Sequence, residues 1–265
     1  MVTSFEFKLH PVSDVYVFLV LYPLESGAAD LRFFNSFVTE APRELSAFFA
    51  YMIVPPAPPF PEELHGKTLC GVVSVCSVDA AKGEQLTRPL REAAAPLFYV
   101  GHQAPYPAAQ SMFDDLLRHG LYTYAKGDFV YNLTDSVTAE HLRYGPRIPT
   151  VNSAMHIYPL SGAVHDVPAD ATAFAYRDVN FTHVIAAVSD DPAPMPRYRE
   201  WVRSYWEALH PHSAGGAYVN FLMEEGDDRI AASYRGNYAR LAAIKRRYDP
   251  ENLFRLNQNI RPAAA

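Results

Sequence analysis

The sequence predicts an α+β fold, in which a mostly antiparallel sheet is covered by helices on one face. Two observations favour this class. Strand-like segments follow one another through short connections that suit antiparallel pairing, and helical segments arrive in pairs instead of alternating singly with strands. The chain has 265 residues, of which 49% are hydrophobic and 20% are charged, so a folded protein of one large or two small domains is expected.

Apolar alternation and short apolar runs predict the strands. They are residues 2–9, 14–22, 44–54, 68–78, 121–133, 151–159, 171–176 and 181–188. Within 121–133 we expect a break at Gly127. The proline tract 55–61 is predicted to be a loop that joins two strands, because proline fixes φ and has no backbone N–H to donate.

Apolar residues that recur about every 3.6 positions predict the helices. One carries Leu31, Phe34 and Val38, and others span 83–94, 108–119, 196–209 and a C-terminal stretch ending at Tyr248. Gly120 is placed to end 108–119 with a positive φ. Thr134 or Asp135 is placed to cap a short helix that ends before Gly145.

Charge and hydropathy exclude several classes of function. With 29 acidic and 23 basic residues the net charge is -6, which argues against binding nucleic acid or an anionic membrane. No apolar run approaches the ~20 residues of a membrane-spanning helix. The N-terminus shows no export signal, so a cytoplasmic location is expected.

Common catalytic motifs are absent from the sequence, which has no G-x-G-x-x-G, phosphate loop, G-x-S-x-G or H-E-x-x-H. Cys70 and Cys76 share one strand face without a nearby histidine, so we interpret them as small buried apolar side chains and not as metal ligands. His210 and His212 follow a predicted helix, and a position at a helix C-terminus accounts for their presence without a metal. We therefore expect no metal site.

The C-terminal stretch carries the most specific pattern. Residues 234–260 read YRGNYARLAAIKRRYDPENLFRLNQNI, which resembles the C-terminal segment of the berberine bridge enzyme-like FAD-linked oxidases. Residues 217–221 (AYVNF) resemble the strand that carries the active-site tyrosine of this family. Residues 171–178 (ATAFAYRD) resemble a strand of its substrate domain, and residues 2–11 resemble the last strand of its flavin domain.

This resemblance covers essentially the whole chain and implies its organisation. Residues 1–10 correspond to the end of an FAD-binding domain, 11–215 to the substrate domain, and 216–265 to the berberine bridge enzyme-like C-terminal segment. The expected fold is therefore that of the family's substrate domain. No residue matches the family's phosphate loop or covalent attachment site, so the chain is expected to be truncated and to lack most of the FAD site.

The resemblance also implies a function, the oxidation of an alcohol, sugar or natural product by hydride transfer to FAD. Tyr218 matches the tyrosine that acts as a base or binds the substrate oxygen; the alternative is a core aromatic residue. His156 is a second candidate acid or base.

Five further side chains have expected roles. Asn220 and Tyr158 are candidate substrate-binding residues. Asn257 and Gln258 either reach the flavin ring or satisfy backbone groups. Arg177 is expected to anchor the sheet.

The expected partners are a small-molecule substrate and either a separate FAD-binding domain or a second copy in a homo-oligomer, with no nucleic acid and no membrane. The alternative is a flavin-free binding protein or an inactive remnant of such an oxidase. A tyrosine-rich pocket suits sugars as well as aromatic natural products, and the sequence does not choose between them.

Overall fold

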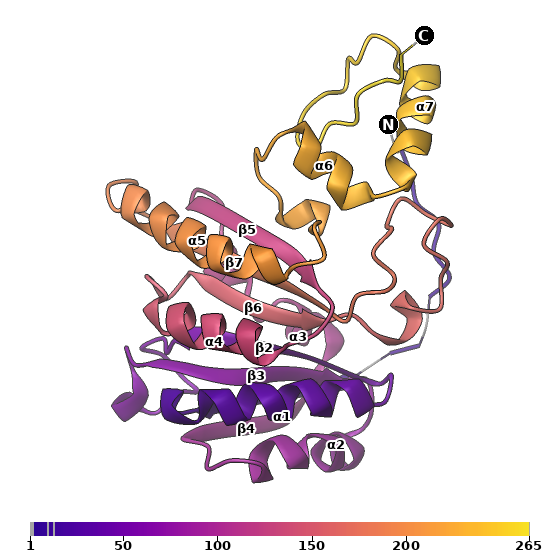
Figure 1. Ribbon diagram of the computed structural model, residues 1–265. Coiled ribbons are helices and arrows are strands. Elements are labelled where there is room, and N and C mark those ends of the chain that lie inside the picture. The colour runs from indigo at the N-terminus through magenta and orange to yellow at the C-terminus, as the bar shows by residue number, and fades with distance from the viewer. Residues whose placement is uncertain (1–2, 10, 13, 265) are drawn as a thin grey trace.

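Seven strands form one antiparallel sheet in the order β4-β1-β3-β2-β6-β7-β5. The structure is a computed structural model and describes residues 3–9, 11–12 and 14–264. The strands are β1 (Asp14–Tyr22), β2 (Leu45–Ile53), β3 (Thr68–Cys76), β4 (Phe98–Pro105), β5 (Tyr122–Val130), β6 (Ala154–Pro159) and β7 (Phe181–Ser189). The predicted α+β class and antiparallel sheet are confirmed (Figure 1).

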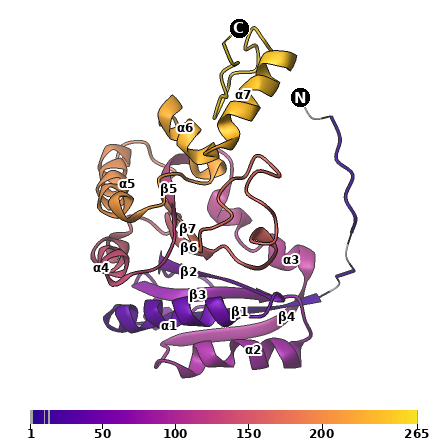
Figure 2. The ribbon, with the colours of Figure 1, turned by 45° about the vertical axis from the view of Figure 1, so that its right-hand side comes forward.

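Four long helices cover one face of this sheet. They are α1 (Gly27–Glu40), α2 (Ala80–Glu92), α4 (Asp135–Tyr144) and α5 (Met195–Leu209). The short helix α3 (Tyr106–Gln110) lies on the opposite side, as Figure 2 shows. The last two helices, α6 (Asp227–Tyr234) and α7 (Asn237–Tyr248), lie beyond the β5 edge of the sheet (Figure 1).

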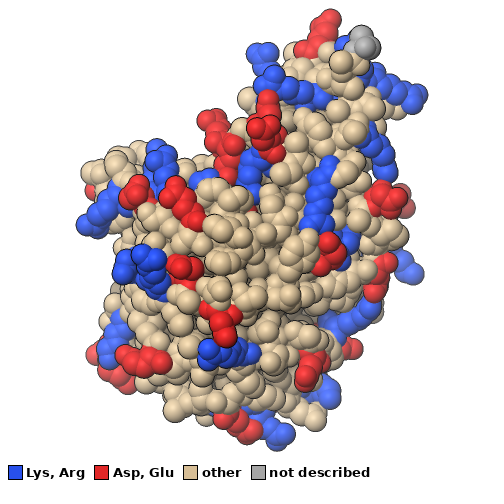
Figure 3. Space-filling model, viewed as in Figure 1, with Lys and Arg blue, Asp and Glu red and all other residues tan. Residues whose placement is uncertain are grey.

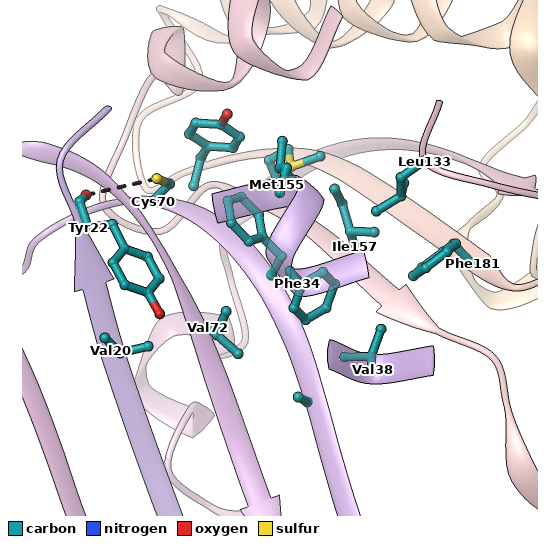
Figure 4. Packing of buried hydrophobic residues seen from close by; sticks show 14 of the residues in the cluster. Val20, Tyr22, Phe34, Val38, Cys70, Val72, Leu133, Met155, Ile157 and Phe181 are labelled. Carbon is teal, nitrogen blue, oxygen red and sulfur yellow. Dashed lines mark hydrogen bonds between the residues drawn. The ribbon is translucent and has the colours of Figure 1, made fainter. Parts of the chain in front are cut away.

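The main core fills the space between the sheet and the four long helices. Phe34 on α1 meets Phe49 on β2 with ring centroids 5.7 Å apart, and both rings are fully buried. In Figure 4 side chains from α1 and several strands converge in this layer. Cys70 and Cys76 are free, fully buried thiols in the same core, as predicted, and the Cys70 sulfur approaches the Tyr22 carbonyl (Figure 4).

Strand β6 contributes side chains both to this core and to the opposite face of the sheet. Successive side chains of a strand point to opposite faces, and Met155 and Ile157 are fully buried in the helix-side core. His156 and Tyr158 therefore project from the other face. That face carries no long helix in the described part of the chain.

Most of the predicted elements form, with shifted ends. Leu31, Phe34 and Val38 are the buried positions expected of α1, and α5 forms almost as predicted. Thr134 caps α4, since its hydroxyl accepts a hydrogen bond from the Val137 N–H at 3.3 Å. The proline tract is a loop.

The predicted N-terminal strand 2–9 is wrong for the residues that the structure describes, and Val2 lies outside them. Residues 3–9 belong to no strand, and Phe5, Phe7 and Leu9 are 74%, 73% and 85% exposed. An alternating segment becomes a strand only when an edge is available to pair with it, and no strand of the sheet pairs with this segment.

The predicted helix 108–119 is also wrong. Its place is taken by α3 and by a 3₁₀ turn, Asp114–Leu117, and the edge strand β4 comes before them. Gly120 has the expected positive φ of 92°, but it precedes β5 and does not end a long helix. Strand β5 runs without a break through Gly127, which pairs with Val184 on β7.

Three further predictions about local structure fail near the C-terminus. Residues 171–176 form an irregular loop and no strand, and residues 219–221 form a 3₁₀ turn where a strand was expected. The C-terminal helix divides into α6 and α7 at Arg235, whose φ of 48° is incompatible with a continuous helix.

Candidate functional site

A pocket of about 480 Å³ opens on the sheet face opposite the long helices. Three segments build it: the paired strands β5, β6 and β7, the loop that follows β6, and the turn that carries Tyr218. Its lining residues are mostly apolar; they are Phe129, Tyr158, Leu160, Val164, Phe174, Arg177, Thr182, Tyr218 and Phe221. Two predicted site residues, Tyr158 and Tyr218, therefore line one pocket although 60 positions separate them in the sequence.

Phe221 lies between these two tyrosines. Its ring centroid is 6.0 Å from that of Tyr158 and 5.2 Å from that of Tyr218, the latter in an edge-to-face arrangement. Such contacts suit the quadrupoles of aromatic rings. Phe221 thereby fixes the spacing of the two phenol groups.

The turn that carries Tyr218 is held by backbone hydrogen bonds. The Phe221 N–H donates to the Tyr218 carbonyl at 2.8 Å. Gln258, from the C-terminal segment, donates through Nε2 to the carbonyls of Val219 and Leu222 at 3.2 and 2.6 Å. Of the two alternatives for Gln258, the structure shows the one in which its amide hydrogen-bonds to backbone carbonyls. A contact with flavin stays a prediction.

A close approach of two segments at Gly216 brings this turn to the pocket. The Gly216 carbonyl accepts a hydrogen bond from the Phe129 N–H at 2.8 Å. A Cβ at Gly216 would lie 2.1 Å from the Tyr176 hydroxyl, so only glycine fits here. The Tyr176 ring in turn stacks on Phe129 at 4.3 Å. The close approach between β5 and the segment that leads to Tyr218 therefore depends on glycine, which has no side chain, at position 216.

The Tyr218 hydroxyl has a defined partner. Asn220 Nδ2 donates to it at 2.8 Å. Asn220 was expected to share a strand face with Tyr218, and it reaches the hydroxyl from a 3₁₀ turn instead. Because the amide N–H donates, the phenol proton remains available for an acceptor in the pocket.

His156 and Tyr158 form a hydrogen-bonded pair on β6, with His156 Nδ1 at 2.7 Å from the Tyr158 hydroxyl. Burial lowers the pKa of His156 to about 4, because it disfavours the imidazolium, and burial raises the pKa of Tyr158 to about 12. Both groups are therefore neutral near pH 7. The Phe48 ring packs against both, at 4.7 and 5.2 Å.

The pocket brings only some of the predicted residues together. Tyr158 and Tyr218 line it, whereas His156 is not among its lining residues and reaches it only through Tyr158. Asn257 is exposed, has a φ of 59° and lies outside the lining. Arg177 is an anchor as expected, but it holds the loop and not the sheet: its guanidinium donates to the carbonyls of Phe174 and Val164 and to the Thr172 hydroxyl.

The sequence interpretation missed a buried ionic cluster behind the pocket. Asp128 on β5 is fully buried and bonds to Arg229 on α6 and to His210, the latter at 3.1 Å. Arg229 lies 3.6 Å from Glu225, which pairs with Lys126 at 2.8 Å. The signal in the sequence was a pair of charged residues, Lys126 and Asp128, on one face of a predicted strand. This cluster attaches the segment around Tyr218 to the sheet.

Charge is dispersed over the surface. Figure 3 shows acidic and basic side chains interspersed on one face of the described residues, without an extended area of one sign. Among the helices of the part of the chain that the structure describes, none has the length and apolar character needed to cross a membrane.

Comparisons with known proteins agree with the pattern at the C-terminus. A family profile described as "Berberine and berberine like" matches residues 217–261. An FAD-linked oxidoreductase of Dictyostelium discoideum is 26% identical over 267 residues, which cover 99% of this chain and 55% of that protein. An aclacinomycin-N/aclacinomycin-A oxidase of Streptomyces galilaeus is 30% identical over 124 residues, covering 40% of this chain and 23% of the oxidase.

Solved structures share the fold. The wild-type BBE-like 1 of Physcomitrella patens superposes with a TM-score of 0.78 at 18% identity, covering 97% of this chain and 56% of that one. An aclacinomycin oxidoreductase superposes with a TM-score of 0.73 at 18% identity, covering 96% and 56%. The chain thus spans about half the length of the curated relatives that match all of it.

Proposed function

The chain belongs to the berberine bridge enzyme-like family of FAD-linked oxidoreductases, and from this premise we propose that it supplies the substrate-binding half of an FAD-dependent oxidase or dehydrogenase. The observation that supports the proposal best is the pocket that contains Tyr218, within the segment that the family profile matches. The substrate is proposed to be a small molecule that carries an oxidisable hydroxyl group.

The proposed roles follow from the hydrogen bonds of the pocket. Tyr218 binds the substrate oxygen and exchanges a proton with it, and Asn220 orients the Tyr218 hydroxyl through its 2.8 Å hydrogen bond. Tyr158 offers a second hydroxyl at the same pocket. His156 positions Tyr158, since its Nδ1 is 2.7 Å from that hydroxyl, and its role as an acid or base stays a prediction.

We propose that the described residues of this chain do not by themselves hold FAD. The sequence contains no phosphate loop, the Gln258 amide is engaged by backbone carbonyls, and Asn257 is exposed. We therefore assign the flavin, which would accept the hydride, to a domain outside these 265 residues. The proposal places no reaction step of the flavin on residues of this chain.

The test uses a fusion of this chain with the flavin-binding half of the Dictyostelium discoideum relative. Tyr218→Phe should lower kcat by about 10²–10⁴-fold, the usual contribution of a positioned acid or base, with an unchanged circular dichroism spectrum. Tyr122→Phe is the matched control, because Tyr122 is 48% exposed and outside the pocket. A fusion that binds flavin and turns over equally fast with Tyr218→Phe would remove the proposed role of this tyrosine.

The alternative, a flavin-free binding protein or an inactive remnant, makes a different prediction. It retains the pocket and binds the same small molecules, but no fusion with a flavin domain oxidises them. A folded, yellow fusion without turnover on any bound ligand would favour this alternative.

A further inference from the structure

The pocket walls provide few groups that could bind the hydroxyls of a sugar. Five lining side chains carry no polar atom at all; they are Phe129, Leu160, Val164, Phe174 and Phe221. The polar lining residues are Tyr158, Arg177, Thr182 and Tyr218. The chemistry of the site therefore depends on which of these four retain a free hydrogen-bonding group.

Two of the four already bond to the protein. The Arg177 guanidinium uses three of its five N–H groups on partners in its own loop, at 3.0 to 3.2 Å. The Thr182 hydroxyl donates its proton to the Asp128 carbonyl at 3.1 Å. The phenols of Tyr158 and Tyr218 each have one protein partner, so each keeps hydrogen-bonding capacity for a ligand.

Five of the nine lining side chains offer no partner to the hydroxyls of a sugar ring. Each hydroxyl that leaves water without finding a partner costs about 1–3 kcal/mol. The hydroxyls of a sugar that face this apolar part of the lining would pay that cost. An aromatic ring carries no such groups along its body, so its burial is favourable over the whole apolar lining.

The aromatic walls present both faces and edges to a ligand. Phe174 meets Phe129 edge-on at 5.7 Å, and it meets Tyr218 at 6.4 Å with an interplanar angle of 71°. Rings arranged in this way accept another ring in offset or edge contact. A volume of about 480 Å³ is within the usual range of small-molecule sites, roughly 300–1,000 Å³.

We propose that the pocket binds a planar, mostly apolar aromatic compound that carries a single hydroxyl, held between the Tyr158 and Tyr218 phenols, in preference to a sugar. This inference rests on the proposed function of the pocket as a substrate site. The aromatic body contacts the apolar wall that includes Phe174 and Phe221, and the hydroxyl lies at the phenols.

The test measures binding to the chain itself by isothermal titration calorimetry, with 2-naphthalenemethanol, 2-methylnaphthalene and cellobiose as probes. We expect 2-naphthalenemethanol to bind at least tenfold more tightly than cellobiose. We expect 2-methylnaphthalene to bind about two- to tenfold more weakly than the alcohol, since a net hydrogen bond contributes about 0.5–1.5 kcal/mol. Equal or tighter binding of cellobiose would overturn the proposal.

Variants locate the binding in the pocket. Phe174→Ala should weaken 2-naphthalenemethanol about two- to tenfold, because one aromatic contact contributes about 0.5–1.5 kcal/mol. Val164→Phe should weaken binding by placing a larger side chain in the pocket, and it leaves the backbone carbonyl that Arg177 uses in place. Phe5→Ala is the control, because Phe5 is 74% exposed and outside the pocket. Unchanged binding by both pocket variants would contradict the proposal.

The two proposals fail in different ways. If 2-naphthalenemethanol binds but a yellow fusion with a flavin domain oxidises neither it nor any other bound alcohol, the proposed function is wrong and the ligand class stands. If the fusion oxidises cellobiose faster than the aromatic alcohol, the ligand class is wrong and the oxidase function stands.

Discussion

Replacement of Arg229 by methionine tests how the C-terminal segment is attached to the sheet. Arg229 on α6 forms an ion pair with Asp128 on β5, and the two side chains are 10% and 0% exposed. Arg229 also donates to the carbonyls of Gly127 and Gly215 at 2.8 and 2.9 Å. Methionine retains most of the volume and removes the charge and all of these hydrogen bonds.

The expected cost follows from burial. Without Arg229 the Asp128 carboxylate keeps only its bond to His210, so a buried charge loses its main compensation. Breaking a buried ion pair from one side typically lowers the free energy of unfolding by about 3–5 kcal/mol. The carbonyls of Gly127 and Gly215 lose a donor as well, which adds to the upper part of that range.

The assay is urea denaturation at pH 7, with Arg32→Met as the matched control. Arg32 pairs with Asp135, but these side chains are 62% and 84% exposed, and an exposed pair contributes no more than about 1 kcal/mol. Asp128→Asn combined with Arg229→Met should recover a part of the loss, because no buried charge then remains alone. If Arg229→Met costs no more than Arg32→Met, the reasoning about the buried cluster is refuted.

Three further predictions concern other parts of the fold. Burial lowers the pKa of His183 to about 4, so between pH 6.5 and 4 the unfolded chain takes up a proton that the native chain does not, and the free energy of unfolding falls as the pH falls. His183→Leu should therefore remove about 1–2 kcal/mol of the loss of stability between pH 7 and pH 5, measured by urea titration. An unchanged pH dependence would contradict this. Thr134→Ala should lower the free energy of unfolding by about 1 kcal/mol through loss of the α4 cap, and a loss under about 0.3 kcal/mol would show that the cap contributes little. Gly216→Ala should lower the thermal midpoint, because the new Cβ would lie 2.1 Å from the Tyr176 hydroxyl, and an unchanged midpoint would show that the two segments can separate freely.

The sequence predicted best the elements whose burial pattern is strong along their own length. Strand β7 is buried at all nine positions, and five of them, residues 184–188, form a continuous apolar run in the sequence. The helix α5 shows its aromatic stripe at helical spacing. In contrast, β4 is an edge strand whose side chains are mostly exposed, so no apolar run in the sequence predicts it. Only its pairing with β1 makes it a strand.

The candidate site was only partly predictable for a similar reason. Alternation along one strand places His156 and Tyr158 on one face, and a resemblance to a family motif singles out Tyr218. Phe174 and Phe221 come from a loop and from a turn, and only the tertiary fold brings them to Tyr218. The pair of Asp128 and Arg229 joins positions 101 residues apart, which no local pattern reveals.

The central claim is that the Tyr218 pocket is the substrate site of a flavin-dependent oxidoreductase. The most direct measurement is the anaerobic bleaching of the flavin absorbance when the fusion described above is mixed with 2-naphthalenemethanol. We predict that the rate of bleaching saturates with the concentration of the alcohol and is lowered by Val164→Phe. Saturable bleaching that is unchanged by Val164→Phe, or no bleaching of a folded and yellow fusion with either this alcohol or cellobiose, would contradict the claim.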